Sequence, residues 1–336
     1  MKLYQIQSAF GIDNLAIAER PEPQPGPGQV LLKMLAYSLN YRDLLVVKGL
    51  YNSKLKLPFT PLSDGVGKVA AIGDGVRRVK VGDRVCPLFM QQWLEGQVTD
   101  AKSRSALGGG GDGVLAEYAV FHEDGVIPVP AHLSDPEAAT LPCAGLTAWH
   151  ALVTEGKLTA GDVVLTQGTG GVSLFALQFA RLVGARVIAT SSSEIKLARA
   201  LHLGASDGIN YKTTPEWGDK ARELSGGTGV DHVIEVGGAG TIGQSLRAVR
   251  ANGRISLIGI LSGTGAFNLT SILMRNLCIQ GIFVGSREMF EAMNKAIALH
   301  RMHPVIDRVF DFSEVPDAFR HMESATHIGK ICIETK

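Results

Sequence analysis

A glycine-rich turn between a predicted strand and a predicted helix is the first feature that indicates chemistry. The apolar run VVLTQ leads into GTGGVS, and a long amphipathic segment follows. In such a unit the backbone amides at the helix N-terminus can bind a pyrophosphate. Gly168 is placed to make the sharp turn, Gly170 to let the backbone approach the ligand, and Gly171 to expose amides. Ser173 replaces the third glycine of the fingerprint and is small enough for close helix packing, so the pattern predicts a dinucleotide site.

The residues after the next predicted strand, RVIAT, favour NADP(H) over NAD(H). An NAD-preferring site usually has an acidic residue there, which binds the ribose 2′-hydroxyl and repels a 2′-phosphate. This chain has neutral donors at Ser191, Ser192 and Ser193, and a positive charge at Lys196. Together they complement a phosphate dianion. A second interpretation is compatible with the first: Ser191 and Glu194 form a capping box for the next helix, and Lys196 is a solvated surface charge.

The elements that position this turn alternate between helix and strand patterns from Pro136 onward. Their strands are apolar throughout, which predicts a parallel sheet covered by helices on both faces. The first third of the chain has short apolar strands between Pro/Gly turns, which predict an irregular antiparallel barrel. These strands are expected at residues 29–35, 65–72 and 83–87. The stretch 88–113 ends in GGGGDG and is expected to be a surface loop, for which a plain flexible loop is favoured over a lid. Residues 327–335 are expected to pair back into the barrel.

Composition and charge exclude several classes of partner. The chain has 336 residues, with 33 Lys and Arg against 32 Asp and Glu, so it lacks the basic excess that nucleic-acid binding usually needs. Its four cysteines are far apart and form no CxxC pair, which argues against a disulfide framework. We find no secretory signal pattern and no apolar run long enough to span a membrane. A cytoplasmic protein acting on a small-molecule substrate is therefore expected.

Several longer segments, taken in order, carry a resemblance to a known family. They are NYRDLLVVKGLY, PLSDGVGKVAAIGDGVRRVKVGDRV, LPCAGLTAWHAL, QGTGGVSLFALQFARLVGARVIATSSS and GIFVGSREMFEAM. The chain resembles the quinone-oxidoreductase-like branch of the zinc-independent medium-chain dehydrogenases/reductases. The resemblance implies an α/β fold, in which a Rossmann doubly wound parallel sheet is joined to a GroES-like irregular β-barrel catalytic domain. It also implies a homodimer, for which CIQGIFVG is the expected pairing edge.

Domain limits and cofactor contacts follow from this resemblance. We expect the catalytic domain at 1–124, the NADP(H)-binding domain at 125–267, and the end of its sheet with a return to the catalytic domain at 268–336. Thr147 matches a position near the nicotinamide, and Lys330 a tail lysine near the phosphate, whereas Tyr211 fits an ordinary edge residue equally well. The full set of expected cofactor contacts is Thr147, Gly168, Thr169, Gly170, Gly171, Val172, Ser173, Ser191, Ser192, Ser193, Lys196, Tyr211, Gly237, Gly259, Phe283, Val284 and Lys330.

The ligands that zinc-dependent relatives use are largely replaced. Asn40 stands where the catalytic cysteine is expected, and Ser63 with Asp64 where a His-Glu pair is expected. Zinc prefers thiolate and imidazole, so Cys143 alone cannot complete a site with three protein ligands. Cys143 is expected to be a small packing residue instead. We therefore predict no metal.

Without a Lewis acid, activated acceptors are the better substrates. In a quinone or an α,β-unsaturated carbonyl the charge that follows hydride addition is delocalised onto oxygen, so orientation and a hydrogen-bond donor suffice. The predicted catalytic residues are Asn40 to orient the acceptor, Tyr41 or Tyr51 to donate a proton or hydrogen bond, and Asp43 to anchor their loop. Tyr41 fits a packing aromatic equally well, and Asp43 fits a structural role better. A zinc-type alcohol dehydrogenase, an enoyl-thioester reductase and a non-catalytic NADP(H)-binding protein remain alternatives.

Overall fold

The computed structural model describes residues 1–263, 265 and 269–335 and divides the chain into two compact units. Unit 1 consists of Met1–Leu146 and Val284–Lys336, and unit 2 of Thr147–Phe283. The expected boundary after residue 124 needs correction, because residues 125–146 pack with unit 1. The expected end of the second domain at residue 267 is also too early, because unit 2 extends to Phe283.

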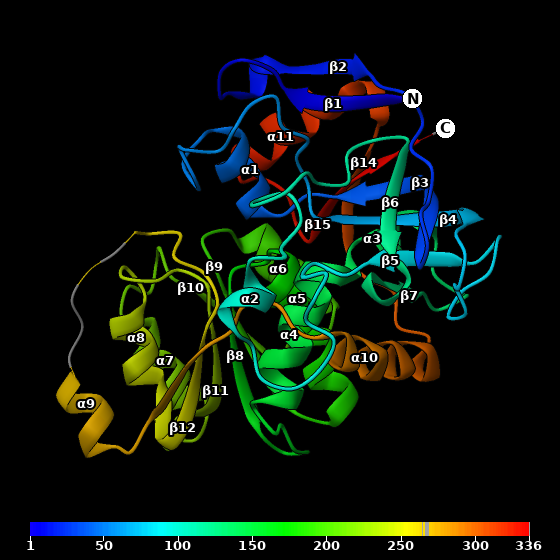
Figure 1. Ribbon diagram of the computed structural model, residues 1–336. Coiled ribbons are helices and arrows are strands. Elements are labelled where there is room, and N and C mark those ends of the chain that lie inside the picture. Colours follow the sequence, from blue (N-terminus) through cyan, green and yellow to red (C-terminus); the bar gives the residue numbers. More distant parts are fainter. Residues whose placement is uncertain (264, 266–268, 336) are drawn as a thin grey trace. The chain divides into compact units, whose positions relative to one another are not determined.

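Unit 2 is the predicted doubly wound parallel sheet. Its six strands run in the order β10-β9-β8-β11-β12-β13, with bounds Val163–Gln167 (β8), Arg186–Ser191 (β9), Asp207–Asn210 (β10), Val230–Glu235 (β11), Val249–Leu257 (β12) and Cys278–Gly281 (β13). Figure 1 shows α5 and α6 against one face and α7 and α8 against the other. The helices are α4 (Leu146–Trp149), α5 (Gly171–Val183), α6 (Glu194–His202), α7 (Trp217–Leu224), α8 (Ile242–Ala248) and α9 (Leu269–Met274). The strand order reverses between β8 and β11, where such folds bind ligands.

Both faces of this sheet are covered by apolar side chains, as the continuous apolar strands predict. Leu165 and Val233 are fully buried on neighbouring strands, together with Trp217 and Ile242 from α7 and α8. On α5, Phe179 packs edge-on against Trp149 at a ring-centroid distance of 5.3 Å. Burying each large apolar side chain contributes about 1.5–3 kcal/mol, so packing holds the turn between β8 and α5 in place.

Unit 1 contains a seven-stranded sheet, described by the order β14-β15-β3-β4-β5-β7 with β6 paired to β3, and a separate β1-β2 pair. The strand bounds are Lys2–Ile6 (β1), Leu15–Glu19 (β2), Gln29–Ser38 (β3), Asp64–Ile72 (β4), Arg84–Pro87 (β5), Tyr118–His122 (β6), Val126–Pro128 (β7), Ile306–Asp311 (β14) and Lys330–Glu334 (β15). The helices are α1 (Tyr41–Val47), α2 (Asp100–Ser103), α3 (Asp135–Ala139), α10 (Arg287–His300) and α11 (Val315–Glu323). The predicted tail strand is β15, which pairs antiparallel with β3.

The register of three strands brings polar residues from distant parts of unit 1 together. Ser38 at the end of β3 pairs with Asp64 at the start of β4 and with Cys332 on β15. Because β3 runs antiparallel to both neighbours, its end lies beside the starts of β4 and β15. The residues just beyond Ser38 therefore meet Asp64 and Lys330.

The segment 88–113 is only partly the surface loop that its glycines predict. Leu88, Phe89, Met90 and Trp93 are each at most 2% exposed, so its first part belongs to the core of unit 1. The prediction of a surface loop was wrong for the first part because it rested on the composition of the whole segment. Glycines dominate that composition, but they follow the buried apolar residues.

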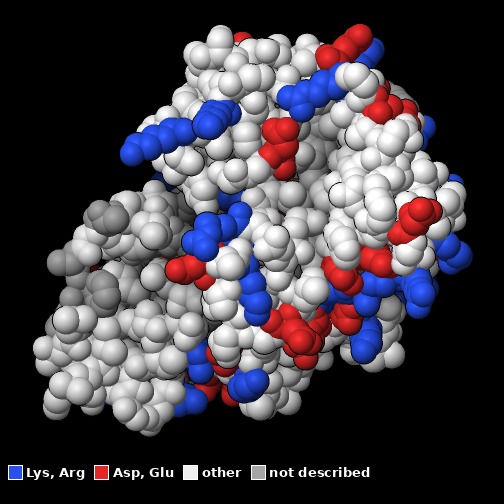
Figure 2. Space-filling model, in the orientation of Figure 1, with Lys and Arg blue, Asp and Glu red and all other residues white. Residues whose placement is uncertain are grey.

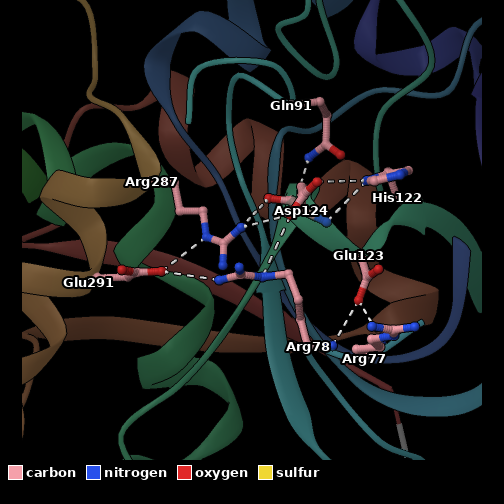
Figure 3. Close-up of polar contacts among 9 residues, drawn as sticks. Arg77, Arg78, Gln91, His122, Glu123, Asp124, Arg287 and Glu291 are labelled. Atoms are coloured by element: carbon pink, nitrogen blue, oxygen red, sulfur yellow. Dashed lines mark hydrogen bonds and ion pairs between the residues drawn. The ribbon is translucent and has the colours of Figure 1, made fainter. Parts of the chain in front are cut away.

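Charged side chains hold α10 on unit 1. Arg287, whose side chain is 7% exposed, donates to Asp124 and to Glu291. Arg78 approaches the same two carboxylates, and Figure 3 shows the two guanidinium groups next to each other, with Glu291 on one side and Asp124 on the other. Elsewhere on the face drawn in Figure 2, acidic and basic side chains are intermixed. Among the described residues, no helix has the length and apolar character needed to cross a bilayer.

Candidate active site and nucleotide-binding turn

A buried chain of hydrogen bonds in unit 1 links four of the residues gathered by β3, β4 and β15. The Lys330 ammonium donates to Leu39 O at 2.6 Å and to Asn40 Oδ1 at 2.5 Å. Asn40 Nδ2 lies 3.5 Å from Ser63 Oγ, and Ser63 Oγ donates to Asp64 Oδ1 at 2.7 Å. We call Asn40, Ser63, Asp64 and Lys330 the Asn40 cluster. It combines a cation, an amide, a hydroxyl and a carboxyl group in a region from which water is largely excluded.

Burial raises the pKa of two neighbouring groups, Asp64 of the Asn40 cluster and Cys143. It raises the pKa of Asp64 to about 6, although the Lys330 charge and the Asn40 amide oppose the shift. Burial also raises the pKa of the Cys143 thiol to about 12, and the Asp64 carboxylate adds to this effect. Cys143 N donates to Asp64 Oδ2 at 3.0 Å, so the two residues are neighbours. Asp64 can therefore exchange a proton near neutral pH, whereas Cys143 stays a thiol.

Asp43 is fully buried and holds the start of α1 through hydrogen bonds. Its carboxylate accepts from Asn40 N at 2.8 Å and from Arg42 Nη2 at 3.3 Å. Burial raises the pKa of Asp43, and the Arg42 charge opposes that shift. The Arg42 guanidinium also lies 4.3 Å from the Phe89 ring centroid and donates to Leu107 O. Asp43 thus positions Asn40 at the start of α1.

The two candidate tyrosines lie on the surface of unit 1. Tyr41 is 48% exposed at the start of α1, and Tyr51 is 45% exposed. The Arg42 guanidinium lies 5.9 Å from the Tyr51 ring centroid. Both hydroxyls are therefore accessible to a ligand, and neither residue belongs to the Asn40 cluster. Their role as donors stays a prediction.

The donor set at the Asn40 cluster does not match zinc. A zinc site needs thiolate, imidazole or carboxylate ligands, and here Asn40 Oδ1 accepts from an ammonium group whose charge would repel a dication. The raised pKa of Cys143 opposes the thiolate form that a metal requires. Within the described residues, no group of three or more His, Cys, Asp and Glu side chains has an arrangement that could hold a metal ion.

In unit 2 the glycine turn has the geometry that a phosphate cradle needs. Gly168 has φ +70°, a conformation that favours glycine, and Gly170 is the N-cap of α5. A Cβ on either glycine would meet nothing within 4 Å, so the space in front of the backbone is open. Ser173 is buried and donates to Gln167 O at 2.6 Å, which ties the first turn of α5 to β8. These residues fit a bound dinucleotide pyrophosphate.

The serine run adopts a different cap from the one expected. Ser193, and not Ser191, is the N-cap of α6 and accepts from Lys196 N, so the predicted capping box between Ser191 and Glu194 is wrong. The Ser191 side chain accepts from Ser193 N at 3.3 Å. Glu194 accepts from Asn210 Nδ2 at 2.5 Å, which directs its carboxylate to β10. The capping-box prediction was wrong because β9 extends through Ser191. The N-cap of α6 therefore lies two residues later, at Ser193.

A second buried polar network stands beside the glycine turn, where the strand order reverses. Glu235 at the end of β11 is 0% exposed and accepts from the side chains of Gln167, Thr241 and Ser245 at 2.5–2.7 Å. It also accepts from the backbone amides of Gly237 and Gly238 at 2.8 and 3.0 Å. We call this set the Glu235 network. It fixes the loop that follows β11 to the end of β8.

The remaining expected cofactor residues have varied environments. Thr147 and Val284 are buried, Phe283 and Tyr211 are each 42% exposed, and Tyr211 N donates to Ser191 O. A Cβ on Gly237 or Gly259 would lie 2.3 Å from Thr241 Oγ1 or 2.4 Å from Val236 O, so close packing requires glycine at both. Lys330 is buried in unit 1, where its ammonium donates to Leu39 O and Asn40 Oδ1, and its expected contact with the cofactor phosphate stays a prediction.

Sequence analysis missed the partners that complete both networks. Ser63 and Asp64 were identified only as replacements for metal ligands, and their adjacency to Asn40 was the available signal. Glu235 and Gln167 gave a weaker signal: each is a polar residue that ends an apolar parallel strand. The ends of such strands meet at the ligand-binding edge of an α/β sheet.

Comparison with known proteins assigns the class. Residues 26–131 match the alcohol dehydrogenase GroES-like domain, and residues 171–299 match the zinc-binding dehydrogenase family. A zinc-type alcohol dehydrogenase-like protein of Schizosaccharomyces pombe is 46% identical over 96% of both chains. An acryloyl-coenzyme A reductase of Metallosphaera sedula is 28% identical over 95% of this chain and 96% of the relative.

Solved structures agree with this class. The chain is similar to a putative alcohol dehydrogenase from Sinorhizobium meliloti, with a TM-score of 0.91, 43% identity and 99% coverage of both chains. It is also similar to an NAD-dependent alcohol dehydrogenase, with a TM-score of 0.91, 32% identity and 100% coverage of both chains. Mycobacterial Rv1454c complexed with NADPH has a TM-score of 0.82, 26% identity and 99% coverage of both chains.

The fold and the two sites thus define an NAD(P)-dependent oxidoreductase. The chain belongs to the medium-chain dehydrogenase/reductase family.

Proposed function

We propose that this protein is a zinc-independent, NADP(H)-dependent reductase of quinones or α,β-unsaturated carbonyls. The observation that carries the proposal is the Asn40 cluster. Three of its positions, Asn40, Ser63 and Asp64, correspond to those where zinc-dependent relatives are expected to bind metal. Here they belong to a hydrogen-bonded chain that starts at the buried ammonium of Lys330. Such a chain supplies donors and a proton to an acceptor whose charge is already delocalised, and does not require a Lewis acid.

The residues of the cluster have distinct roles in this mechanism. The nicotinamide supplies the hydride when it is bound. Lys330 holds Asn40 Oδ1, which leaves Asn40 Nδ2 to donate to the acceptor oxygen as charge develops. Asp64 accepts from Ser63 Oγ when it is ionised. Because its pKa is about 6, it is also protonated in part, and in that form its proton can move through Ser63 Oγ toward that oxygen. Tyr41 and Tyr51 are alternative proton donors from the surface side.

The preference for NADP(H) rests on the end of β9. The short segment from the end of β9 to the N-cap of α6 consists of Ser191, Ser192 and Ser193. Lys196 lies in the first turn of α6. The Glu194 carboxylate in the first turn of α6 already accepts from Asn210 Nδ2 at 2.5 Å, so it has a partner within the protein. A 2′-phosphate would therefore meet neutral donors and a lysine.

Reduction of an enoyl thioester is the second candidate. It uses the same hydride addition to a conjugated carbonyl, and the relative named as an acryloyl-coenzyme A reductase favours it. A zinc-type alcohol dehydrogenase is suggested by the name of the Schizosaccharomyces pombe relative, but the donor set at Asn40 opposes it. A non-catalytic NADP(H)-binding protein would keep the glycine turn and consume no cofactor.

Oxidation of NADPH and NADH by the purified protein separates these functions. The acceptors are quinones, enones, enoyl thioesters and simple aldehydes, each at equal concentration. We expect NADPH consumption with quinones or enones and little with aldehydes. Activity confined to enoyl thioesters would select the second candidate, and activity confined to NADH with aldehydes would contradict the proposal. No consumption with any acceptor would favour a binding protein.

We further propose a cytoplasmic homodimer that pairs through β13, with a small molecule and not a nucleic acid or membrane as its ligand. β13 is an edge strand of the sheet of unit 2. Leu269, Leu273 and Met274 on α9 are each at least 69% exposed, which gives the unit an apolar surface that a second copy would cover.

A further inference from the structure

The position of the Lys330 ammonium depends on a short segment that precedes it in unit 1. Lys330 is the first residue of β15, and residues 324–329 connect it to the end of α11. We call these residues the 324–329 segment. The two elements it joins are in contact, because α11 packs against both β14 and β15 (Figure 1). How this segment is held therefore decides where the Lys330 side chain begins.

The backbone of this segment lies tightly against the residues at the start of β14. Lys330 N donates to Val305 O at 2.9 Å, and Lys330 pairs with Ile306 in the parallel register of β14 and β15. Gly329 has φ +82°, and a Cβ there would lie 2.3 Å from Val305 O. Glycine is therefore required at this close approach, which fixes how the chain enters β15.

Asp307 on β14 holds the same segment with its side chain. Its Oδ1 accepts from Ile328 N at 2.9 Å, and its Oδ2 lies 2.7 Å from His321 Nε2 on α11. A carboxylate only accepts, so His321 carries a proton on Nε2 and donates it. Asp307 thus joins β14, α11 and the 324–329 segment at a point two residues before Lys330.

The Asp307 carboxylate is ionised and its orientation is fixed. Burial acts to raise the pKa of Asp307, but the hydrogen bonds from His321 and from Ile328 N hold it below its usual range. The His321 ring also contacts Phe310 and His327, at centroid distances of 5.8 and 6.2 Å. Hydrogen bonds to an ionised acceptor are about twice as strong as those between neutral groups, so this anchor is a strong one.

The effect of Asp307 on the Asn40 cluster passes through the backbone. Lys330 is 4% exposed, and its ammonium reaches Leu39 O and Asn40 Oδ1 at 2.6 Å or less, which allows little displacement of its backbone. A shift of about 1 Å at a catalytic group can lower a rate about 100-fold. A looser 324–329 segment would therefore weaken the contact that orients Asn40.

We propose that Asp307 is a positioning residue for Lys330: by accepting from Ile328 N it holds the 324–329 segment against β14 and so keeps the Lys330 ammonium on Asn40 Oδ1. The effect on catalysis rests on the proposed reductase function, whereas the placement of the ammonium does not. Asp307→Ala removes the acceptor for Ile328 N and should release the segment. Asp307→Asn keeps an acceptor at Oδ1, and its Nδ2 can donate to His321 once the imidazole proton lies on Nδ1, so it should hold the segment.

The ¹⁵N signal of the Lys330 ammonium, in full-length protein labelled at its lysine side chains, reports this placement without turnover. The signal is assigned by its absence in Lys330→Met. We expect Asp307→Ala to shift it and Asp307→Asn to leave it near its wild-type position. Asp317→Ala, which removes an exposed carboxylate of α11 from Arg320, is the matched control and should leave the signal unchanged.

Kinetics supply a readout that a purely structural role would not move. Asp307→Ala should lower kcat for quinone or enone reduction about tenfold while the KM for NADPH stays within about twofold, and Asp307→Asn should recover most of kcat. An unchanged kcat beside a shifted signal would contradict a positioning role. Failure of the wild type to reduce any acceptor would contradict the proposed function instead, and the ammonium signal alone would then decide this inference.

Two results at the ammonium would overturn the inference. One is an unchanged Lys330 signal in Asp307→Ala, even where its free energy of unfolding is lower. The other is an equal shift in Asp307→Ala and Asp307→Asn. If Asp307→Ala does not fold, His321→Phe takes its place, because it keeps a ring beside Phe310 and removes the donor that orients Asp307. A shift of the Lys330 signal in His321→Phe would support the inference, and no shift would overturn it.

Discussion

The Asn40 cluster of unit 1 and the Glu235 network of unit 2 are both buried and polar, but they are satisfied to different degrees. Glu235 accepts from five donors within 3.0 Å. In the Asn40 cluster, Asn40 Nδ2 has only a 3.5 Å contact with Ser63, and the pKa of Asp64 is raised to about 6. One network fixes a loop, and the other keeps a donor and a proton available.

This difference teaches how to tell a structural network from a reactive one. A carboxylate whose oxygens accept several hydrogen bonds holds its neighbours in one arrangement. A carboxyl group whose pKa is raised by burial toward the working pH, next to a loosely held amide, is suited to proton exchange. Substitutions in the two networks should therefore affect different kinetic constants.

Lys330→Met should have the largest effect. It frees Asn40 Oδ1 and removes the charge that opposes the raised pKa of Asp64. We expect kcat to fall about 100-fold, because the donor that faces the developing oxyanion loses its orientation. The acidic pKa in the kcat profile should also move upward, which a purely structural role would not produce. Lys48→Met, which removes an exposed ion pair with Glu323, is the matched control.

Glu235→Gln should act mainly on cofactor binding. The amide nitrogen cannot accept, so the Gly237 and Gly238 amides or the side-chain donors lose a partner. We expect the KM for NADPH to rise about tenfold with kcat changed less than threefold, since a hydrogen bond to a charged group contributes about 1.5–3 kcal/mol. Steady-state kinetics measure both, with the exposed Glu223→Gln as control. An equal loss in kcat would place Glu235 among the reactive groups.

The pKa of Asp64 gives a pH dependence of stability. Its value in the folded protein, about 6, is above the ordinary 3.8, so the folded state binds this proton more tightly than the unfolded state. Between about pH 4 and 6 this group therefore lowers the free energy of unfolding as the pH rises, by roughly 2–3 kcal/mol in total. Urea unfolding of wild type and Asp64→Asn across this range should show a difference that changes with pH. A constant difference would mean that Asp64 titrates normally.

Lys196→Gln should have the smallest effect, because a single partly exposed charge is screened by water and salt. We expect kcat/KM for NADPH to fall about three- to tenfold and that for NADH to stay within twofold. The ratio of the two constants is the measurement. Equal losses with both cofactors would indicate that Lys196 supports α6 and does not bind a 2′-phosphate.

Much of the fold could be predicted because its signals are local. Continuous apolar strands and amphipathic helices predict unit 2 almost element by element, and the Gly168 turn lies between β8 and α5 as its spacing predicts. The boundaries between the two units could not be predicted from these local patterns. The helical residues 135–146 resemble those that follow them in sequence, yet they pack with unit 1.

The candidate site could be predicted only where its residues are adjacent in sequence. Asn40 and Asp43 were found together because one short motif contains both. Lys330 was assigned to the cofactor because nothing local connects it to Asn40; the antiparallel pairing of β15 with β3 does so. The same limit applies to Gln167 and Glu235, whose contact depends on the parallel pairing of β8 with β11.

The most direct test of the central claim is NADPH-dependent quinone and enone reduction by protein that has been dialysed against a strong chelator, with zinc content measured on the same sample. We predict that metal-free protein keeps its full rate and that added zinc does not raise it, because Lys330, Asn40 and Asp64 supply the donors and the proton. Activity that falls with the zinc content and returns when zinc is added would contradict this mechanism.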